Sequence, residues 1–367
     1  MDLLLGLSTK NIFKLLKQNH FEVEAKYFPR LLVMLISSSI NSYQNIFERK
    51  YLKRNINEIN GSNIEDPVFI IGHWRSGTTF LHNLIINDEQ FASPNIFEIS
   101  NPTNFLYRED KYLKKFENFG ERKRPMDNIK ITQTSPGEDE FAISAHSLIS
   151  PLFSWVFPQN ANKYKQYLTL ENSSAEEIKE WEASFIYFLK KLNFRYRKKL
   201  LLKSPTHTGK ISNIIKLFPN AKFIHIYRDH EAVFKSTFNL YKKMIGLTCL
   251  HGSNEQEIEK IIIDYYKELY NKYLSDRKLI KEGNIVDVTY SDLVKDNLQT
   301  IKHIYNHLNL NFSDNFENNL INYINSQKNY KPNILPQIDT KLKNRLDLEW
   351  GNIKEKIEGL YKYYSVT

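Results

Sequence analysis

The chain has 367 residues, a formal net charge of +9 and a single cysteine, Cys249. This length suits one large α/β domain or two ordinary ones. One cysteine excludes an intramolecular disulfide framework and is typical of a reducing compartment. The positive balance suits phosphorylated ligands, nucleic acid or an anionic membrane surface, but acidic and aromatic residues interrupt the basic runs. We therefore expect a cytoplasmic protein that does not bind nucleic acid.

Residues 1–65 are predicted to form a helical N-terminal extension. Its longest apolar run, Leu31–Ile40, is shorter than the roughly 20 residues that a membrane-spanning helix needs, and the first ten residues lack the pattern of an export signal. Four apolar residues lie among basic neighbours: Phe28, Leu32, Met34 and Leu35. We favour packing of this segment on the main domain and leave open a peripheral membrane contact through an amphipathic helix.

Beyond a turn predicted at Asn60–Asp66, short apolar runs alternate with amphipathic stretches. Strands are predicted over Val68–Ile71, Leu200–Leu202, Phe223–Tyr227 and Ile285–Val288. Helices are predicted over Gly77–Ile86, Gly209–Leu217, Glu231–Lys243 and Ser291–Leu308. Repeated strand–helix order predicts a parallel sheet with helices on both faces, whose strand ends lie along one edge. We expect a core at 66–311 and a C-terminal extension at 312–367 that packs on it, as a single domain overall.

The first predicted strand leads into the loop Gly72–Thr79, GHWRSGTT, and then into a helix. Unpaired amide groups at a helix start, together with the helix dipole, favour an anion there. Gly77 lets the backbone approach closely, Thr78 and Thr79 offer hydroxyl donors, and Arg75 offers a planar set of donors for phosphate or sulfate. The loop therefore predicts an anion cradle.

A nucleoside-triphosphate loop is the main competitor for this pattern. A Walker loop places lysine directly after its second glycine, whereas Thr78 follows Gly77 here and the cation, Arg75, precedes the glycine. The loop therefore argues against ATP or GTP chemistry.

The sequence PVFIIGHWRSGTTFLHNL, which starts at Pro67, resembles the 5′-phosphosulfate loop of the sulfotransferases, where a basic residue precedes S-G-T-[TS]. The GHWRSGTT form is most similar to the broad, largely bacterial branch of that superfamily. The resemblance implies a three-layer fold like that of the P-loop-containing nucleoside-triphosphate hydrolases. It also implies the donor 3′-phosphoadenosine 5′-phosphosulfate, bound by Arg75, Ser76, Gly77, Thr78 and Thr79. The resemblance extends loosely over residues 67–310.

A second pattern lies in KFIHIYRD, where a predicted strand ends at Arg228 and Ser236 follows eight positions later on a helix. Both side chains can then reach one anion at the sheet edge. This spacing resembles the 3′-phosphate motif of the family, which distinguishes a 3′-phosphorylated nucleotide from ATP. A surface arginine paired with Asp229 is the alternative.

Lys203 ends the predicted strand in LLLKSPTH, and a lysine there is poorly solvated unless it meets an anion. It resembles the strand-end lysine of the family, which contacts the oxygen that bridges phosphate and sulfuryl groups. Phe80 stands where the cytosolic branch has an adenine-stacking tryptophan, and core packing explains it equally well. Tyr290, in VTYSDL, matches the strand-end tyrosine of the family, which implies an adenine contact.

Sulfuryl transfer is an in-line displacement with demands close to those of phosphoryl transfer. We expect Arg75 and Lys203 to stabilise charge on the leaving phosphate, without a required metal. The catalytic histidine of the cytosolic branch corresponds here to Pro205, so that role does not carry over. Glu98 stands comparably to the catalytic glutamate of the tyrosyl-protein branch and is our preferred base. His207, in the turn after the strand-end lysine, is an alternative.

The acidic run in SPGEDEFAI supplies two further candidate bases. Ser135 and Glu138 have the S-x-x-E spacing of a helix capping box, which explains Glu138 without catalysis. Asp139 and Glu140 then face either the site or water.

The acceptor is expected to be a hydroxyl or amine of a small molecule, lipid or glycan. Aromatic residues of Phe97–Phe116 and Phe141–Phe157, and the C-terminal third, are the expected sources of its pocket. A P-loop small-molecule kinase and a non-catalytic nucleotide-binding scaffold remain alternative functions, and the sequence predicts no oligomeric state.

Overall fold

The computed structural model describes residues 4, 6–61, 63–116, 121–124, 129–327 and 337–361. Contacts within the chain divide it into two compact units that alternate along the sequence. Unit 1 comprises Met1–Ile64, Pro94–Arg197 and Leu240–Ile261, and unit 2 comprises Glu65–Ser93, Lys198–Asn239 and Ile262–Thr367. The boundary expected near residue 65 coincides with a change of unit, whereas the segment 66–311 contributes to both units.

Unit 2 contains a five-stranded parallel sheet in the order β2-β5-β1-β6-β7. Its strands are β1 (Val68–Ile71), β2 (Phe91–Ala92), β5 (Lys199–Lys203), β6 (Lys222–Tyr227) and β7 (Ile285–Thr289). The four predicted strands all form, to within one residue at each end, and their parallel direction is confirmed. The short strand β2 was not predicted, because two residues carry no periodic pattern.

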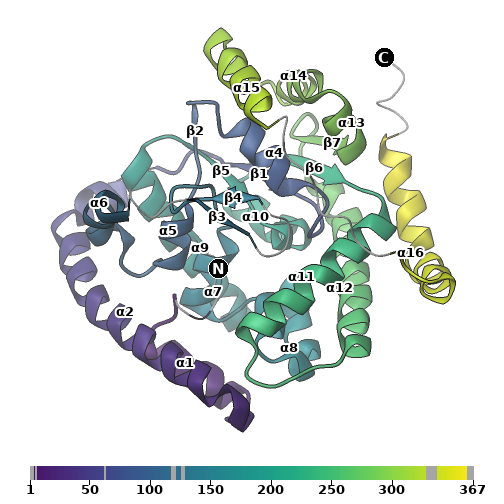
Figure 1. Ribbon diagram of the computed structural model, residues 1–367. Coiled ribbons are helices and arrows are strands. Elements are labelled where there is room, and N and C mark those ends of the chain that lie inside the picture. Colours follow the sequence, from purple (N-terminus) through teal and green to yellow (C-terminus); the bar gives the residue numbers. More distant parts are fainter. Residues whose placement is uncertain are drawn as a thin grey trace. The chain divides into compact units, whose positions relative to one another are not determined.

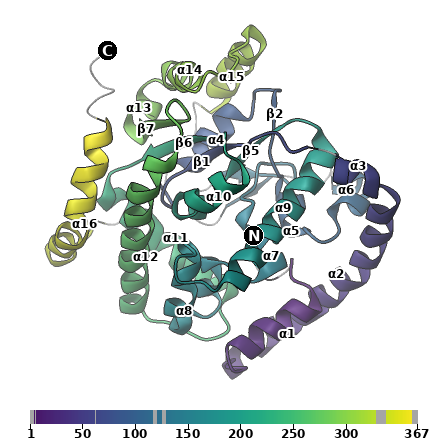
Figure 2. The same ribbon diagram turned by 180° about the vertical axis from the view of Figure 1, so that it is seen from behind.

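Helices cover both faces of this sheet (Figures 1 and 2). On one face, β1 presents Val68 and Ile70 to an apolar cluster that includes side chains of four helices. These are α4 (Thr78–Ile85), α13 (Tyr290–Lys295), α14 (Asn297–His307) and α15 (Asp314–Ser326). Successive strand residues point to opposite faces, so Phe69 lies on the other face, where it stacks on Phe223. Both faces are thus buried, as parallel sheets require.

The segment predicted as one helix over Ser291–Leu308 is two helices, α13 and α14, which meet at Asp296. Asp296 has φ −147° and ψ 93°, values that no helix interior allows, and its side chain accepts a hydrogen bond from the Gln299 amide. Aspartate competes with the helical backbone for such amides and is therefore favoured at N-caps. The turn expected at Asn60–Asp66 also begins later, because the helix α3 (Ile56–Gly61) continues through Gly61.

The remaining helices of unit 2 are α10 (Ile211–Leu217) and α16 (Thr340–Tyr361), while α11 (His230–Thr248) and α12 (Glu255–Asp276) run through both units. The buried Trp350 of α16 stacks on Tyr266 with 3.9 Å between ring centroids and donates to the Ile263 carbonyl. This packing joins α16 to α12 within unit 2.

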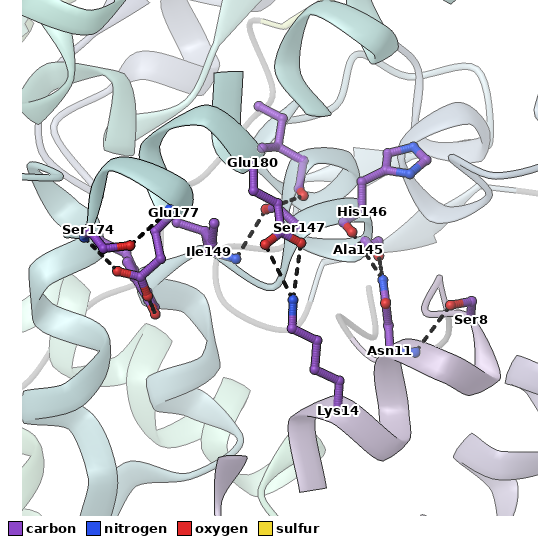
Figure 3. A network of polar contacts seen from close by, with 12 residues as sticks. Ser8, Asn11, Lys14, Ala145, His146, Ser147, Ile149, Ser174, Glu177 and Glu180 are labelled. Carbon is purple, nitrogen blue, oxygen red and sulfur yellow. Dashed lines mark hydrogen bonds and ion pairs between the residues drawn. The ribbon is translucent and has the colours of Figure 1, made fainter. Parts of the chain in front are cut away.

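Unit 1 is mainly helical and contains a two-stranded antiparallel ribbon. Its elements are α1 (Thr9–Gln18), α2 (Phe28–Arg54), α3, α5 (Ile96–Ser100), α6 (Phe105–Phe116), β3 (Arg122–Lys123), β4 (Lys130–Ile131), α7 (Glu140–Ser147), α8 (Ala161–Lys165) and α9 (Ala175–Tyr196). Figure 3 shows how α1 is attached: the Asn11 side chain donates to the carbonyls of Ala145 and His146, and Lys14 pairs with Glu180. No helix in the described ranges is long and apolar enough to cross a membrane.

A buried ion pair joins α2 to α9. The ammonium of Lys191 lies 2.6 Å from a carboxylate oxygen of Glu48, and both side chains are almost fully buried. Lys191 also donates to the Pro102 carbonyl, and the other oxygen of Glu48 accepts the Tyr107 amide. Burial lowers the pKa of Lys191, while the negative charge of Glu48 opposes this effect. The pair therefore fixes which side of α2 faces the interior.

Loss of one member of this pair leaves an uncompensated buried charge. We expect Lys191→Met to lower the free energy of unfolding by about 3–5 kcal/mol, measured by urea denaturation with circular dichroism. The double variant Glu48→Gln/Lys191→Met should lose less, because it removes both charges. Lys14→Met breaks the exposed pair with Glu180 and should cost under about 1 kcal/mol. Equal losses for Lys191→Met and Lys14→Met would contradict the buried pair.

Candidate functional site

The carboxyl ends of four neighbouring strands carry the predicted donor-binding residues. Gly72 follows β1, Lys203 is the last residue of β5, Arg228 follows β6 and Tyr290 follows β7. The register pairs Ile70 with Lys203 on β5, and the parallel direction places all four ends at one edge. The sheet continues to β5 on one side of β1 and to β6 on the other, which is the switch point where open α/β sheets bind ligands.

Two glycines allow the loop after β1 to turn tightly. Gly72 has φ 146° and Gly77 has φ 107°, both in the region that side chains disfavour. A Cβ at Gly77 would lie 2.5 Å from Cδ2 of Tyr290, and one at Gly72 would lie 2.5 Å from the Ile226 carbonyl oxygen. Glycine is therefore required at both positions for the loop to pack against the ends of β6 and β7.

Three residues that were not predicted from the sequence hold the backbone of this loop in place. The hydroxyl of Thr208, in the short 3₁₀ helix Pro205–Gly209, accepts the Gly72 amide at 2.8 Å and donates to the Gly72 carbonyl at 3.1 Å. Thr237 of α11 donates to the carbonyl of Trp74, and the Tyr270 hydroxyl accepts the amide of His73 at 3.4 Å. No local sequence pattern indicates a role for Thr208 or Tyr270. For Thr237, the one available signal is that it directly follows Ser236, a predicted site residue.

The structure brings the two sequence signatures into direct contact. Nε of Arg75 donates to the hydroxyl of Ser236 at 2.8 Å, and the Arg228 guanidinium donates to the Arg75 carbonyl at 3.4 Å. Arg75 has φ 70°, an uncommon value for a residue with a side chain. The Arg228 guanidinium also lies 4.4 Å from the centre of the Tyr290 ring. Two guanidinium groups, a hydroxyl and an aromatic ring therefore lie together at the sheet edge.

Lys203 lies beside the helix that follows the loop. Its ammonium donates to the Thr79 hydroxyl at 3.3 Å, although the residue is almost fully buried. His82, one turn further along α4, bonds to the Ser93 hydroxyl at 2.8 Å. Burial lowers the pKa of His82 well below its usual value, and the charge of Lys203 lowers it further. His82 is thus neutral, so the positive charge here comes from Lys203.

The loop has the features that an anionic group needs. Gly77 is the N-cap of α4, and no side-chain hydrogen bond caps that helix, so its first amide groups remain available to an anion. The hydroxyl of Ser76 is buried without a hydrogen-bond partner among the described residues, and buried polar groups normally have one. These residues fit a phosphosulfate group.

Glu98 belongs to unit 1, where it serves as the N3 residue of α5. Asn95 and Glu98 form a capping box: each side chain accepts the backbone amide of the other. The second Glu98 oxygen accepts the Tyr196 hydroxyl at 2.9 Å. Burial, and next the negative charge of Glu109, raise the pKa of Glu98 to about 8. Glu98 therefore has both a structural role and a pKa suited to proton transfer near neutral pH.

The capping box predicted for Ser135 and Glu138 does not form. Helix α7 begins at Glu140 with Asp139 as its N-cap, and the Ser135 hydroxyl instead accepts the Thr132 amide. Asp139 and Glu140 are both buried in unit 1, so neither faces bulk water. Glu140 accepts the hydroxyl of Ser150 at 2.6 Å.

His207 and Phe80 lie in unit 2. His207 is buried in the 3₁₀ helix that contains Thr208, with its ring edge-on to Phe69 at 5.3 Å between centroids. Phe80 is partly buried and packs against the apolar cluster under α4.

Aromatic residues expected to line an acceptor pocket are mostly core residues of unit 1. Those that are buried are Phe105, Phe153, Trp155 and Phe157. Tyr107 is partly exposed and stacks on Phe47. Among the residues that the structure describes, no cluster of three or more His, Cys, Asp or Glu side chains is arranged to hold a metal ion.

Known proteins resemble this chain in sequence. The model of the Sulfotransferase family matches residues 67–314. Two curated relatives are the omega-hydroxy-beta-dihydromenaquinone-9 sulfotransferase Stf3 of Mycobacterium bovis and that of Mycobacterium tuberculosis. Each is 32% identical to this chain over 298 residues, which cover 81% of the chain and 76% of the relative.

Two solved structures share the fold. Sulfotransferase STF9 from Mycobacterium avium has a TM-score of 0.65 at 16% identity, with 98% of this chain and 97% of its own covered. Sulfotransferase STF1 from M. tuberculosis has a TM-score of 0.61 at 19% identity, with 89% and 87% covered. These likenesses confirm the expected P-loop-like α/β fold with helical extensions. Together with the family match, they show that the chain belongs to the sulfotransferase family and is an enzyme dependent on 3′-phosphoadenosine 5′-phosphosulfate.

Proposed function

We propose that this enzyme transfers a sulfuryl group to a hydroxyl of a lipophilic small molecule, with the donor held at the carboxyl edge of the unit 2 sheet. The observation that carries the proposal is the contact between the two signatures, in which Arg75 donates to Ser236 and Arg228 donates to Arg75. The loop Gly72–Thr79 is suited to one anionic group, and Arg228 is suited to another. Their contact would let both bind one nucleotide, which carries a 5′-phosphosulfate and a 3′-phosphate.

We propose a role in nucleotide binding for each residue of the donor site. Arg75, Ser76, Gly77, Thr78 and Thr79 would hold the 5′-phosphosulfate end through backbone amides, hydroxyls and one guanidinium. At the other end, Arg228 and Ser236 would hold the 3′-phosphate.

The adenine ring is assigned to two aromatic residues, Tyr290 and Phe80. The contact between Tyr290 and Arg228 supports a place for Tyr290 next to the nucleotide, whereas the packing of Phe80 on the core explains that residue without a ligand.

The donor supplies an activated sulfuryl group. In the transfer, a bond forms between the acceptor oxygen and sulfur, the bond between sulfur and the 5′-phosphate oxygen breaks, and the acceptor proton passes to a base. Lys203 and Arg75 would stabilise the negative charge that grows on the phosphate oxygen, and fixed cations in a buried site do so with little reorganisation. Because His82 is neutral, it adds no positive charge beside Lys203.

Glu98 is our proposed base, with Asp139, Glu140 and His207 as alternatives. The raised pKa of Glu98 supports this role, because a base works best when its pKa is near the working pH. The Asn95 capping box and the Tyr196 hydroxyl hold the carboxylate in one orientation.

The acceptor class follows from the relatives. Both Stf3 proteins are named for omega-hydroxy-beta-dihydromenaquinone-9, a molecule whose name specifies a hydroxyl group. We propose an acceptor of the same kind, a hydroxylated lipophilic molecule, in preference to a glycan or an amine.

Arg228→Ala tests the 3′-phosphate site. Hydrogen bonds to charged groups contribute about 1.5–3 kcal/mol, so we expect this variant to weaken binding of adenosine 3′,5′-bisphosphate by about 10- to 150-fold in calorimetry. Binding of 5′-AMP, which lacks the 3′-phosphate, should change little. Lys295→Ala removes an exposed cation of unit 2 and is the matched control. Equal weakening of both nucleotides would show that Arg228 does not recognise the 3′-phosphate.

Lys203→Met tests the chemical step. With radiolabelled donor and an omega-hydroxylated menaquinone, the wild type should form a sulfated product, and the variant should lower kcat by about 10²–10³-fold while it still binds adenosine 3′,5′-bisphosphate. An acceptor without the hydroxyl is the control and should remain unlabelled. Donor binding without transfer to any hydroxylated acceptor would favour a non-catalytic scaffold, and phosphorylation by ATP with Mg²⁺ would favour a kinase.

The pH dependence of kcat/KM tests the base. Because Glu98 accepts a proton only when ionised, and its pKa is about 8, kcat/KM should rise about tenfold per pH unit up to pH 8 and then level off. Glu109→Gln removes a neighbouring negative charge, so this limb should move to lower pH. Glu98→Gln should lower kcat by about 10²–10⁴-fold.

His207→Gln, Asp139→Asn and Glu140→Gln are the comparison variants for the base. Glu98 would be ruled out as the base if Glu109→Gln left the rise of kcat/KM toward pH 8 unchanged. It would also be ruled out if one of these three variants lowered kcat more than Glu98→Gln does.

A further inference from the structure

Helix α2 places polar residues inside and apolar residues outside. Of its four buried side chains, Ser38, Asn41 and Glu48 are polar. Seven large apolar or aromatic residues are each at least 50% exposed, and we call them the α2 stripe: Phe28, Leu32, Val33, Ile36, Ile40, Tyr43 and Ile46. A surface helix of a globular protein normally shows the reverse arrangement.

The α2 stripe is continuous along one side of the helix. Residues four apart lie on the same face of a helix, so Phe28, Leu32, Ile36 and Ile40 form one row, and Tyr43 extends it. The stripe covers 19 residues of the helix, or about 28 Å at 1.5 Å per residue. Met34, which the sequence grouped with Phe28 and Leu32 in the membrane contact that was left open, is buried on the opposite side.

A rotation of α2 that buried the stripe would break the polar contacts of the helix. Glu48 is paired with Lys191 inside unit 1, and the Ser42 hydroxyl accepts the Thr9 amide at 2.9 Å. Arg30 also donates to the Gly246 carbonyl at 2.8 Å. Polar anchors along the length of the helix thus hold the apolar side outward.

The charges around the stripe favour an anionic partner. Glu48 is the only acidic residue in the sequences of α1 and α2, and it is buried. The same two helices carry eight basic residues: Lys10, Lys14, Lys17, Arg30, Arg49, Lys50, Lys53 and Arg54. Lys50 and Arg54 continue the rows of Ile46 and Tyr43 on the exposed face. A second copy of this surface would present the same positive charge, whereas an anionic bilayer complements it.

We propose that α2 is a membrane-docking helix, which lies in the plane of an anionic lipid surface with the stripe among the acyl chains and its basic C-terminal turns at the headgroups. The helix contacts the surface and does not span it, because its interior side is polar and attached to unit 1. The inference does not depend on which acceptor the enzyme uses, and vesicle binding is measured without donor or acceptor.

Sedimentation with vesicles tests this surface on the full chain. Wild type should bind vesicles of phosphatidylcholine with phosphatidylglycerol and bind pure phosphatidylcholine much less. Leu32→Glu/Ile36→Glu should weaken binding at least tenfold. Leu348→Glu alters a leucine that is 85% exposed on α16 and is the matched control, which should bind like wild type. Lys50→Gln/Arg54→Gln should weaken binding about thirtyfold, since each cation near such a surface contributes about fivefold.

Tyr43→Trp gives an independent reading of depth. The four native tryptophans, Trp74, Trp155, Trp181 and Trp350, are all buried, so quenching by brominated acyl chains should report the new residue. Unchanged thermal unfolding and binding of adenosine 3′,5′-bisphosphate would show that the variants fold. Equal vesicle binding by wild type and Leu32→Glu/Ile36→Glu would overturn the proposal. The stripe would instead bind a second copy of the chain if wild type did not bind vesicles but formed a dimer in light scattering, and if Leu32→Glu/Ile36→Glu abolished that dimer.

Discussion

Parallel pairing of β5, β1, β6 and β7 is the constraint on which the donor site depends. These strands run in one direction, so the residues at their carboxyl ends are brought to one edge although they are far apart in the sequence. The register pairs Ile70 of β1 with Lys203 of β5 and Ile71 with His225 of β6. The close packing of Gly77 against Tyr290 and of Gly72 against Ile226 is a consequence of that register.

The donor site brings three cationic side chains to one edge of the sheet. Arg75 and Arg228 are in contact through a backbone carbonyl, and Lys203 is buried beside Thr79. The carboxylate of Asp229 accepts the Ala232 amide and lies beside His230, which lowers its pKa to about 2. Such a group of cations is favourable mainly when an anion is bound, which suits a donor with negative charge at both ends.

Unit 1 shows how burial changes the chemistry of ordinary residues. Glu98 is a helix-capping residue, yet its burial close to Glu109 raises its pKa to about 8, which suits the role of base proposed for it. Lys191 remains paired with Glu48 because neither charge has access to water. That pair also determines the orientation of α2, so a buried electrostatic contact decides which surface the helix presents outside.

Local sequence patterns were sufficient to predict the main strands and the chemical groups of the donor site. The four main strands, the loop Gly72–Thr79 and the spacing of Arg228 and Ser236 follow from local patterns of apolar, glycine and charged residues, and the structure agrees with them. Which distant residues meet depends on the packing of separate elements. Thr208 holds Gly72, and His82 lies near Lys203, through contacts between separate elements that no local pattern encodes.

One local pattern did not form as predicted. The Ser135 hydroxyl bonds to the Thr132 amide, so the capping box expected with Glu138 is absent, while Asn95 and Glu98 form one at α5. Helical periodicity likewise defines two faces of α2 without indicating which faces the interior. Tertiary contacts of Glu48 settled that choice, because its buried pair with Lys191 holds the polar side of α2 inside unit 1.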